Sequence, residues 1–199
     1  MITLGLTGMS GSGKSFVANL FSEFGIPSIN ADAVVHRLYA DKNECTVKLK
    51  SVFGEGILNP DHSINRKALG KIVFSDRAKL ALLNETVHPL VINEMRVMIQ
   101  GAKEQGKKAV ILDAPQLFES HLDADCDYII AVIADEETRL QRIAMRDGIT
   151  IDAAKIRLAN QHPNIFFKEH SDFCIENSRG ADLKTQIIGI LREIGLIYE

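Results

Sequence analysis

The stretch I-T-L-G-L-T-G-M-S-G-S-G-K-S, residues 2–15, decides the fold that the sequence predicts. Its last eight residues, from Gly8 to Ser15, satisfy the pattern G-x-x-x-x-G-K-[S/T], a loop whose backbone N–H groups cradle nucleotide phosphates. Apolar residues 2–6 predict a buried strand before the loop, and apolar residues at helical spacing over 16–24 predict a helix after it. A phosphate loop needs this context, because the helix N-terminus and the loop then face the same anion. We therefore expect a nucleoside triphosphate site that includes Gly8, Gly11, Ser12, Gly13, Lys14, Ser15 and Phe16.

Two side chains of this loop have predicted chemical roles. Lys14 offers a point charge to the β and γ phosphates, and the Ser15 hydroxyl is the expected ligand of Mg²⁺. ATP and Mg²⁺ are therefore the predicted cofactors.

Composition limits the class of protein. The chain has 199 residues, of which 46% are hydrophobic and 25% charged, which suits one α/β domain with a small inserted lobe. A net charge of −3 gives no sign of a nucleic-acid or acidic-membrane partner. Three scattered cysteines favour a reducing compartment over a disulfide framework or a zinc site, and no apolar run approaches the ~20 residues of a membrane span. With a strand starting at Ile2, we expect no signal peptide, and a cytoplasmic monomer or weak homo-oligomer that acts on a small molecule.

Asp32 is the first acidic residue at a predicted strand end. Residues 26–30 predict a short second strand, which we expect beside the strand that feeds the phosphate loop, and residues from 33 onward predict a helix. In open α/β sheets, ligands bind at the carboxyl ends of the strands. Aspartate is also a common helix N-cap, so position alone leaves both roles open for Asp32.

The strand–helix alternation stops between residues 41 and 106. Helical patterns over 48–53, 66–74 and 76–105 predict a helical insertion, and Pro89 predicts a kink or break in the longest helix near His88. We expect one domain with its core at 1–40 and 107–199, and an acceptor-binding lobe at about 41–106.

Acidic and basic residues mark the second half of the chain. Residues 108–113 predict a buried strand that ends on Asp113, whose carboxylate is placed to hold Mg²⁺ directly or through water. Further strands are predicted at 128–133 and 173–176, with helices at 136–146, 151–161 and 183–194. Arg139, Arg142 and Arg146 share one helix face, which is either a solvated face or part of a lid over the polyphosphate at about 139–168.

These segments together resemble one family, the dephospho-coenzyme A kinases. The similar segments, in order, are residues 6–15, I-N-A-D at 29–32, R-x-x-L…F at 66–74, His88-Pro89, D-A-P-Q-L-F-E at 113–119, Arg142 with Arg146-Asp147, Gln161 through Lys168, and I-E-N-S at 175–178. The chain departs from the family pattern at Met9, which replaces a glycine, at Asn30 and Glu176, which replace aspartates, and at Gln116, which replaces a leucine. His36 lies where many relatives carry arginine.

The resemblance implies a P-loop NTPase-type three-layer α/β fold with a parallel sheet, a helical acceptor-binding insertion and an arginine-bearing lid. It also implies ATP-dependent phosphorylation of the ribose 3′-hydroxyl of dephospho-coenzyme A. The residues it assigns to catalysis are Asp32, Lys14, Arg142 and Arg146. It adds Asn177 to the nucleotide site, Ser15 and Asp113 to the metal, and Asp32, Arg66, His88, Leu117, Glu119 and Gln161 to the acceptor.

Other functions also fit a phosphate loop. A guanine-specific switch would need an N-K-x-D element and a D-x-x-G after the third strand, and the sequence has neither. Another small-molecule kinase and a non-catalytic ATP-gated binding module remain as alternatives. The pairing of Asp32 and Asp113 with an arginine lid argues against the binding module.

Overall fold

The computed structural model of the chain describes residues 1–159 and 161–198 and forms two compact units. One unit combines Met1–Ile29 with the chain from Gly101 onward, and the other is Asn30–Gln100. The phosphate loop lies in the first unit and Asp32 in the second. The insertion was expected at 41–106. The second unit starts earlier than this, at Asn30, and also ends earlier, at Gln100.

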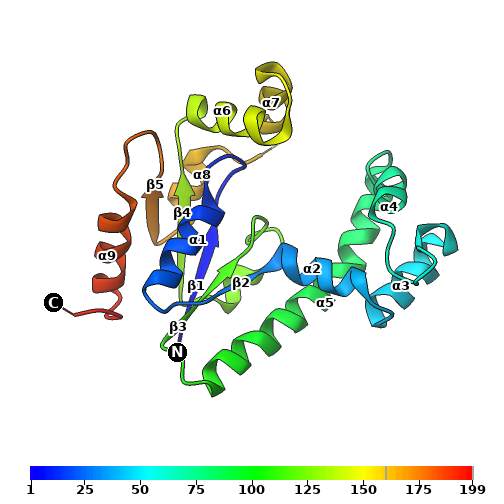
Figure 1. The fold of residues 1–199 in the computed structure, drawn as a ribbon, viewed down its shortest axis with the longest axis horizontal. Coiled ribbons are helices and arrows are strands. Elements are labelled where there is room, and N and C mark those ends of the chain that lie inside the picture. The colour runs from blue at the N-terminus through cyan, green and yellow to red at the C-terminus, as the bar shows by residue number, and fades with distance from the viewer. Residues whose placement is uncertain (160, 199) are drawn as a thin grey trace. The chain divides into compact units, whose positions relative to one another are not determined.

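The first unit is built on parallel strands, with β1 (Ile2–Thr7) paired to β3 (Ala109–Asp113) on one side and to β4 (Tyr128–Ile133) on the other. β5 (Phe173–Glu176) pairs with β4, and β2 (Ser28–Asn30) completes the sheet in the order β2-β3-β1-β4-β5 (Figure 1). The expectation that the second strand neighbours the strand feeding the phosphate loop is wrong, because β3 lies between them.

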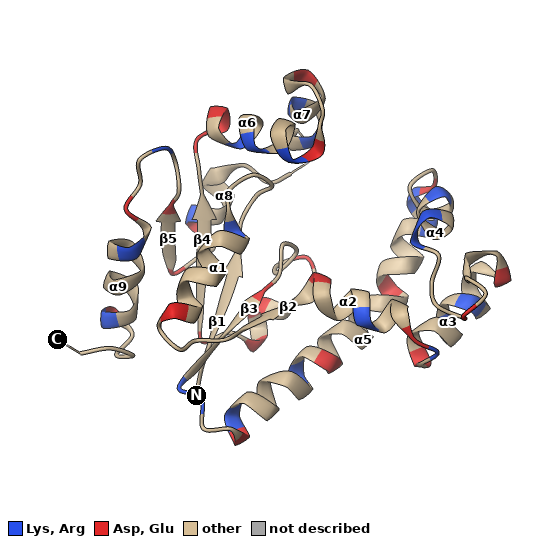
Figure 2. Cartoon of the chain, viewed as in Figure 1, with Lys and Arg blue, Asp and Glu red and all other residues tan. Residues whose placement is uncertain are grey.

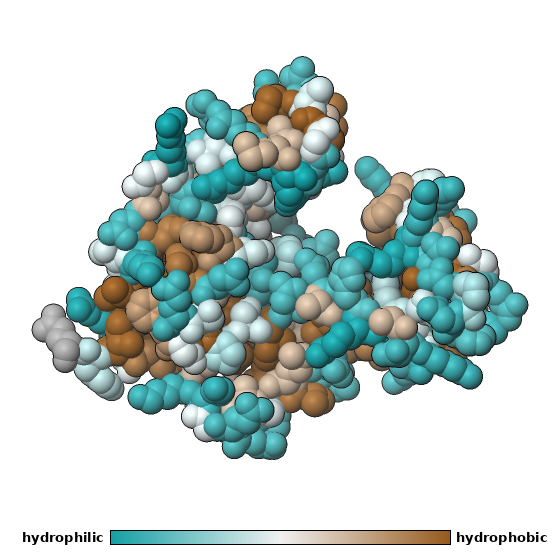
Figure 3. All heavy atoms as spheres, viewed as in Figure 1, coloured by the Kyte–Doolittle hydropathy of each residue, from teal (hydrophilic) through white to brown (hydrophobic). Residues whose placement is uncertain are grey.

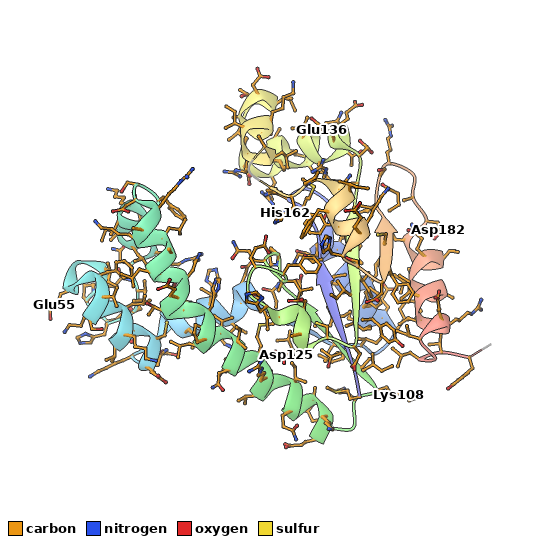
Figure 4. The ribbon with its side chains drawn as sticks, turned by 180° about the vertical axis from the view of Figure 1, so that it is seen from behind. Glu55, Lys108, Asp125, Glu136, His162 and Asp182 are labelled. Carbon is orange, nitrogen blue, oxygen red and sulfur yellow. The ribbon has the colours of Figure 1, made fainter. Side chains whose placement is uncertain are left out.

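Helices cover both faces of this sheet. Apolar side chains of β1 and β4 pack with α1 (Lys14–Glu23) and α9 (Leu183–Glu193) in one core cluster, which holds Leu4, Phe21, Ile130, Ile187 and Leu191. A second cluster joins β4 to α6 (Glu136–Asp147), α7 (Ile151–Leu158) and α8 (Asn164–Glu169), through Ile133, Ile143, Ala154 and Phe167. The predicted three-layer α/β architecture is therefore confirmed. Asp182 caps α9 by accepting the Thr185 N–H, and Asp182 and Glu136 mark the starts of α9 and α6 in Figure 4.

The second unit is helical. It contains α2 (Ala31–Ala40), α3 (Glu44–Phe53), the short 3₁₀ helix η1 (Glu55–Ile57), α4 (Arg66–Val73) and most of α5 (Arg77–Glu104). Its buried apolar residues include Leu49, Ile57, Leu69 and Met95. Asn43 and Asn65 cap α3 and α4 through side-chain oxygens that accept backbone N–H groups of the first turn.

Three details differ from the sequence-based expectation. α5 is one continuous helix with Pro89 inside it, so the possible break near His88 did not occur. The apolar stripe that contains Val87, Val91 and Met95 is buried on both sides of Pro89, which offsets the loss of one backbone hydrogen bond.

α7 ends at Leu158, before the predicted end at residue 161, and α8 was not predicted. Pro163, which cannot donate a backbone hydrogen bond, stands just before α8. In addition, η2 (Leu122–Asp125) is a 3₁₀ turn between β3 and β4. None of the described helices is long and apolar enough to cross a membrane.

Candidate active site

The loop between β1 and α1 has a backbone that requires glycine at Gly11 and Gly13. Their φ angles are 79° and 86°, in the left-handed region that side chains rarely adopt. A Cβ on Gly11 would lie 2.7 Å from the carbonyl oxygen of Arg139, and a Cβ on Gly13 would overlap the Asn177 side-chain amide. The loop is thus shaped by close approach of α6 and of the segment after β5.

The loop presents polar groups that have no partner within the described part of the chain. Among residues 1–159 and 161–198, no acceptor is found for the backbone N–H groups of Gly11, Gly13, Lys14 and Ser15. The Ser12 hydroxyl oxygen is buried and also has no hydrogen-bond partner within those residues. Unpaired donors at a helix N-terminus beside a lysine form an anion site, because the helix dipole and the N–H groups point the same way.

Lys14 and Asp113 contact each other directly. The Lys14 ammonium meets a carboxylate oxygen of Asp113, and the two side chains are only 10% and 2% exposed. Lys14 is the first residue of α1 and Asp113 the last of β3, which pairs with β1 through the register Leu6–Asp113. The two residues that the sequence assigned separately to phosphate and metal therefore form one buried ion pair in the free protein.

The arginine stripe of α6 faces the phosphate loop. Arg142 Nη1 donates to the carbonyl oxygens of Gly11 and Ser12, each at 3.2 Å. Arg146 Nη2 lies 3.5 Å from the Ser10 hydroxyl, and Nε and Nη2 of Arg146 both donate to the Asp147 carboxylate, which also pairs with Arg157 of α7. Hydrogen bonding to Asp147 raises the pKa of Arg146. Figure 2 shows basic residues along α6, and the solvated-face alternative does not hold for Arg142.

Gln161 and Asn177 hold the loop from two further directions. The Gln161 side-chain oxygen accepts the Ser10 backbone N–H at 2.9 Å. The buried Asn177 amide donates to the Ser12 carbonyl at 2.7 Å. Gln161, which the resemblance assigns to the acceptor, therefore contacts the phosphate loop in the structure. Asn177, assigned to the nucleotide site, contacts the same loop.

Three other predicted residues of the first unit have different surroundings. Leu117 is fully buried and lies under Gly5, where a Cβ would approach it to 2.9 Å, so its side chain has no surface for an acceptor. Glu119 is half exposed and lies 3.5 Å from the imidazole of His162. Phe16 is 59% exposed at the start of α1, where an aromatic ring remains available to a ligand.

The segment around His162 forms an aromatic stack next to Glu119. The His162 ring stacks on Phe166 with centroids 4.0 Å apart, and His170 stacks on the same ring at 4.2 Å. Figure 4 labels His162 in the segment that precedes α8. Further out, exposed apolar side chains of α6 and α7 include Met145 and Ile156. Figure 3 shows brown atoms over these two helices.

In the second unit, the structure resolves the two roles that the sequence left open for Asp32. α2 begins at Ala31, and its cap is Asn30, whose side-chain oxygen accepts the Ala33 N–H at 2.8 Å. Asp32 lies in the first turn, exposed to solvent, and makes no cap hydrogen bond. The helix-cap explanation of Asp32 is therefore wrong, because Asn30 caps the helix.

The other two acceptor candidates of this unit lie on different helices. Arg66 is the first residue of α4, and its guanidinium contacts the ring of His36 on α2. His88 lies within α5, and partial burial lowers its pKa, which favours the neutral imidazole. No hydrogen bond or ion pair joins His88 to Arg66 or Asp32 among the residues that the structure describes.

Two residues that contact the loop were not assigned to the site from sequence. Ser10 receives contacts from both Gln161 and Arg146, although it occupies a variable position of the loop pattern. Arg139 is buried behind the loop with Nη1 against the Met9 sulfur, and burial lowers its pKa. In the sequence, only its position on the same helix face as Arg142 and Arg146 indicated that Arg139 lies near the loop.

The fold and this loop define a phosphate-loop kinase of the small-molecule type. A family model described as dephospho-CoA kinase matches residues 2–182. The chain is 36% identical over 197 residues to the dephospho-CoA kinase of Halalkalibacterium halodurans, covering 98% of each chain, and 35% identical to that of Lactobacillus johnsonii, covering 96% and 98%. The structure of dephospho-CoA kinase from Campylobacter jejuni matches with a TM-score of 0.72 and 26% identity, over 96% of each chain. Shikimate kinase from Acinetobacter baumannii, with a TM-score of 0.56 and 15% identity over 99% of this chain and 96% of the other, shares the fold alone.

The chain belongs to the dephospho-CoA kinase family. It is therefore a transferase, and its activity is the ATP-dependent phosphorylation of dephospho-CoA in the last step of coenzyme A biosynthesis.

Proposed function

We propose that the chain transfers the γ-phosphoryl group of ATP to the ribose 3′-hydroxyl of dephospho-CoA, with Asp32 as the residue that accepts the hydroxyl proton. The observation that carries this assignment is that Asp32 is exposed and free of the cap bond, which Asn30 makes instead. A carboxylate at the carboxyl edge of a parallel sheet is available to orient an acceptor hydroxyl. In a loose transition state the hydroxyl needs little activation, so Asp32 takes the proton late.

On the donor side, we assign the phosphates to the unpaired N–H groups of Gly11, Gly13, Lys14 and Ser15. Lys14, Arg142 and Arg146 stabilise the negative charge of the phosphoryl group in the transition state. Phosphoryl transfer depends on such electrostatic stabilisation, because the protein forms no covalent bond to the transferred group. Arg142 is already fixed against the loop by the carbonyls of Gly11 and Ser12. That fixed position reduces the reorganisation needed at the moment of transfer.

The residues present suit Mg²⁺ bound together with ATP. No group of three His, Cys, Asp or Glu side chains able to hold a metal ion occurs in the described part of the chain. Mg²⁺ in phosphotransferases takes one or two protein oxygens and completes its shell with phosphates and water. Ser15 and Asp113 would supply the protein oxygens, and the ion would neutralise phosphate charge.

The Lys14–Asp113 ion pair has a consequence for nucleotide binding. The Lys14 ammonium and the Asp113 carboxylate contact each other in the free protein. Binding of the polyphosphate gives Lys14 new anionic partners, which frees carboxylate oxygens of Asp113 for the cation. The pair thus keeps both side chains in place before the nucleotide arrives.

We further propose that the chain acts in the cytoplasm as a monomer or weak homo-oligomer, without nucleic-acid or membrane partners. These statements rest on composition and family membership.

The experiment that tests the function measures ADP release with ATP and a panel of acceptors: dephospho-CoA, AMP, adenosine and shikimate. We expect dephospho-CoA to give a kcat/KM at least tenfold above every other acceptor. A preference for AMP or shikimate would replace the proposal with another small-molecule kinase. ATP binding without transfer to any acceptor would favour a binding module.

A further inference from the structure

Asp147 occupies an unfavourable position on its helix. It is the last residue of α6, where the helix dipole presents partial negative charge, so a carboxylate there destabilises the helix and a cation stabilises it. The hydrogen bond from Arg146, with a smaller effect of the charge of Arg157, nevertheless lowers the pKa of Asp147. The carboxylate is therefore stabilised at this position by its two arginine partners and not by the helix.

The first of these contacts fixes the direction of Arg146. Nε and Nη2 of Arg146 donate to the two carboxylate oxygens of Asp147 at 2.8 and 2.9 Å, which makes a bidentate pair. Adjacent residues of a helix do not face each other, so this pair holds the Arg146 side chain in one particular orientation. In that orientation Nη2 also lies 3.5 Å from the hydroxyl of Ser10 in the phosphate loop. No partner of Arg146 Nη1 is found in the described part of the chain, which leaves this nitrogen for an anion.

The second contact comes from α7. Arg157 Nη1 meets Oδ2 of Asp147, the same oxygen that accepts from Arg146 Nη2. Packing of the two helices sets the position of Arg157, because its neighbour Leu158 is buried together with Ala154 in an apolar cluster that includes side chains of α6. Arg146, Asp147 and Arg157 thus form a charged triad that reaches the phosphate loop.

The charged triad has a net charge of +1, from two guanidinium groups and one carboxylate. Asp147 is the least exposed of the three, at 21% against 58% for Arg146 and 50% for Arg157. Without Arg157, the carboxylate of Asp147 would cancel the charge of Arg146. The phosphate loop would then face a neutral pair in place of a cation.

We propose that Arg157 positions Arg146 for phosphoryl transfer. Arg157 holds the Asp147 carboxylate, which directs Arg146 toward the phosphate loop, and its charge compensates that of Asp147. Arg157 acts through these two side chains and does not touch the polyphosphate, so it is a positioning residue. The inference rests on the proposed function, in which Arg146 stabilises the transferred group, and it adds the residue that orients this cation.

Replacing Arg157 by alanine tests this role in the ADP-release assay with ATP and dephospho-CoA. We expect kcat to fall by at least about fivefold, because a misplaced cation stabilises the transition state less. Arg157→Lys should recover most of this loss, since Arg157 meets Asp147 through one nitrogen and an ammonium group can replace it.

Lys155→Ala is the matched control for the loss of charge. It also removes one positive charge from α7, but Lys155 lies 3.8 Å from Asp152 and makes no hydrogen bond or ion pair with the charged triad among the described residues. Its kcat should therefore stay at the wild-type value. An equal loss in Lys155→Ala and Arg157→Ala would make the effect one of overall charge and would contradict the positioning role.

A double variant separates positioning from a purely structural role. If Arg157 acts through Arg146, then Arg157→Ala has no further effect on kcat once Arg146 has been replaced by alanine. If Arg157 only holds α6 and α7 together, its replacement lowers kcat in both backgrounds and lowers Tm as well. That result would overturn the inference.

Asp147→Asn distinguishes orientation from net charge. The substitution raises the net charge of the charged triad from +1 to +2, so a triad that acted through net charge alone would give a higher kcat/KM for ATP. Because the substitution weakens the bidentate pair that orients Arg146, we expect a lower kcat/KM instead. A rise in kcat/KM would contradict the inference.

These outcomes are distinct from failure of the proposed function. A wild-type kcat in Arg157→Ala means that the inference is wrong, although phosphorylation of dephospho-CoA stands. If the wild type phosphorylates a different acceptor, the proposed function fails, and the same variants measured with that acceptor decide the inference. If it phosphorylates no acceptor, both fail.

Discussion

Replacing Asp32 by asparagine separates a catalytic role from a structural one. The exposed carboxylate makes no cap bond, so the substitution removes only its favourable interaction with the N-terminus of α2, worth about 0.3–1 kcal/mol. For a chain of this length, that loss lowers Tm by no more than about 4 °C. If Asp32 accepts the proton of the acceptor hydroxyl, kcat falls by about 10²–10⁴-fold, or roughly 3–5 kcal/mol in activation free energy. KM for ATP should change little, because the phosphate loop is untouched.

Asn30→Ala is the matched control, since it removes the actual cap of the same helix. Loss of an N-cap costs about 0.5–2 kcal/mol of stability, so we expect a lower Tm with kcat within about threefold of the wild type. Steady-state kinetics at saturating ATP and dephospho-CoA, paired with thermal unfolding, measures both quantities. A wild-type kcat in Asp32→Asn would refute the reasoning and move the search for the base to Asp113.

Three further predictions concern the donor side and its support. Lys14→Ala should reduce kcat by at least about 10³-fold in the ADP-release assay, and a normal kcat would remove the phosphate-loop assignment. Arg142→Ala should lower kcat/KM for ATP more than Arg146→Ala does, because Arg142 is the one of the two arginines that binds the carbonyls of Gly11 and Ser12. The opposite order would make Arg146 the principal cation of the lid. Hydrogen bonds from the Thr138 backbone and hydroxyl lower the pKa of Asp135 to about 2, so its cap of α6 stabilises the fold above the unfolded pKa near 4 and is lost as pH falls toward 2. Urea unfolding between pH 2 and 5 should therefore show a steeper acid loss in the wild type than in Asp135→Asn, and parallel curves would contradict this.

The donor half of the site was predictable because its chemistry is local in sequence. A strand, a glycine-rich loop and a helix follow one another within residues 2–23, so the pattern alone places Lys14 and Ser15 at a helix N-terminus. Asp113 and Asn177 could be anticipated as residues at the ends of buried strands. The order of those strands could not, because strand pairing depends on contacts distant in sequence, and β3 came to lie between β1 and β2.

The acceptor half depended more on side-chain direction. Leu117 matched the family pattern, yet its side chain is buried under Gly5, and Gln161 turned to the Ser10 N–H. Asn30 and Asp32 are both good capping residues, so only the observed start of α2 shows which of them caps the helix. The His36–Arg66 contact joins residues 30 positions apart on two helices, and no local pattern predicts it.

The most direct test of the central claim is the position of the transferred phosphate. Purified protein is incubated with ATP, Mg²⁺ and dephospho-CoA, and the product is analysed by mass spectrometry and by ³¹P NMR with coupling to the ribose protons. The account predicts one added phosphoryl group, seen as a phosphomonoester coupled to the 3′ proton, and its absence from the Lys14→Ala reaction. A phosphate on the 2′-oxygen or on the pantetheine arm would contradict it. Hydrolysis of ATP without any transfer of phosphate to dephospho-CoA would contradict it as well.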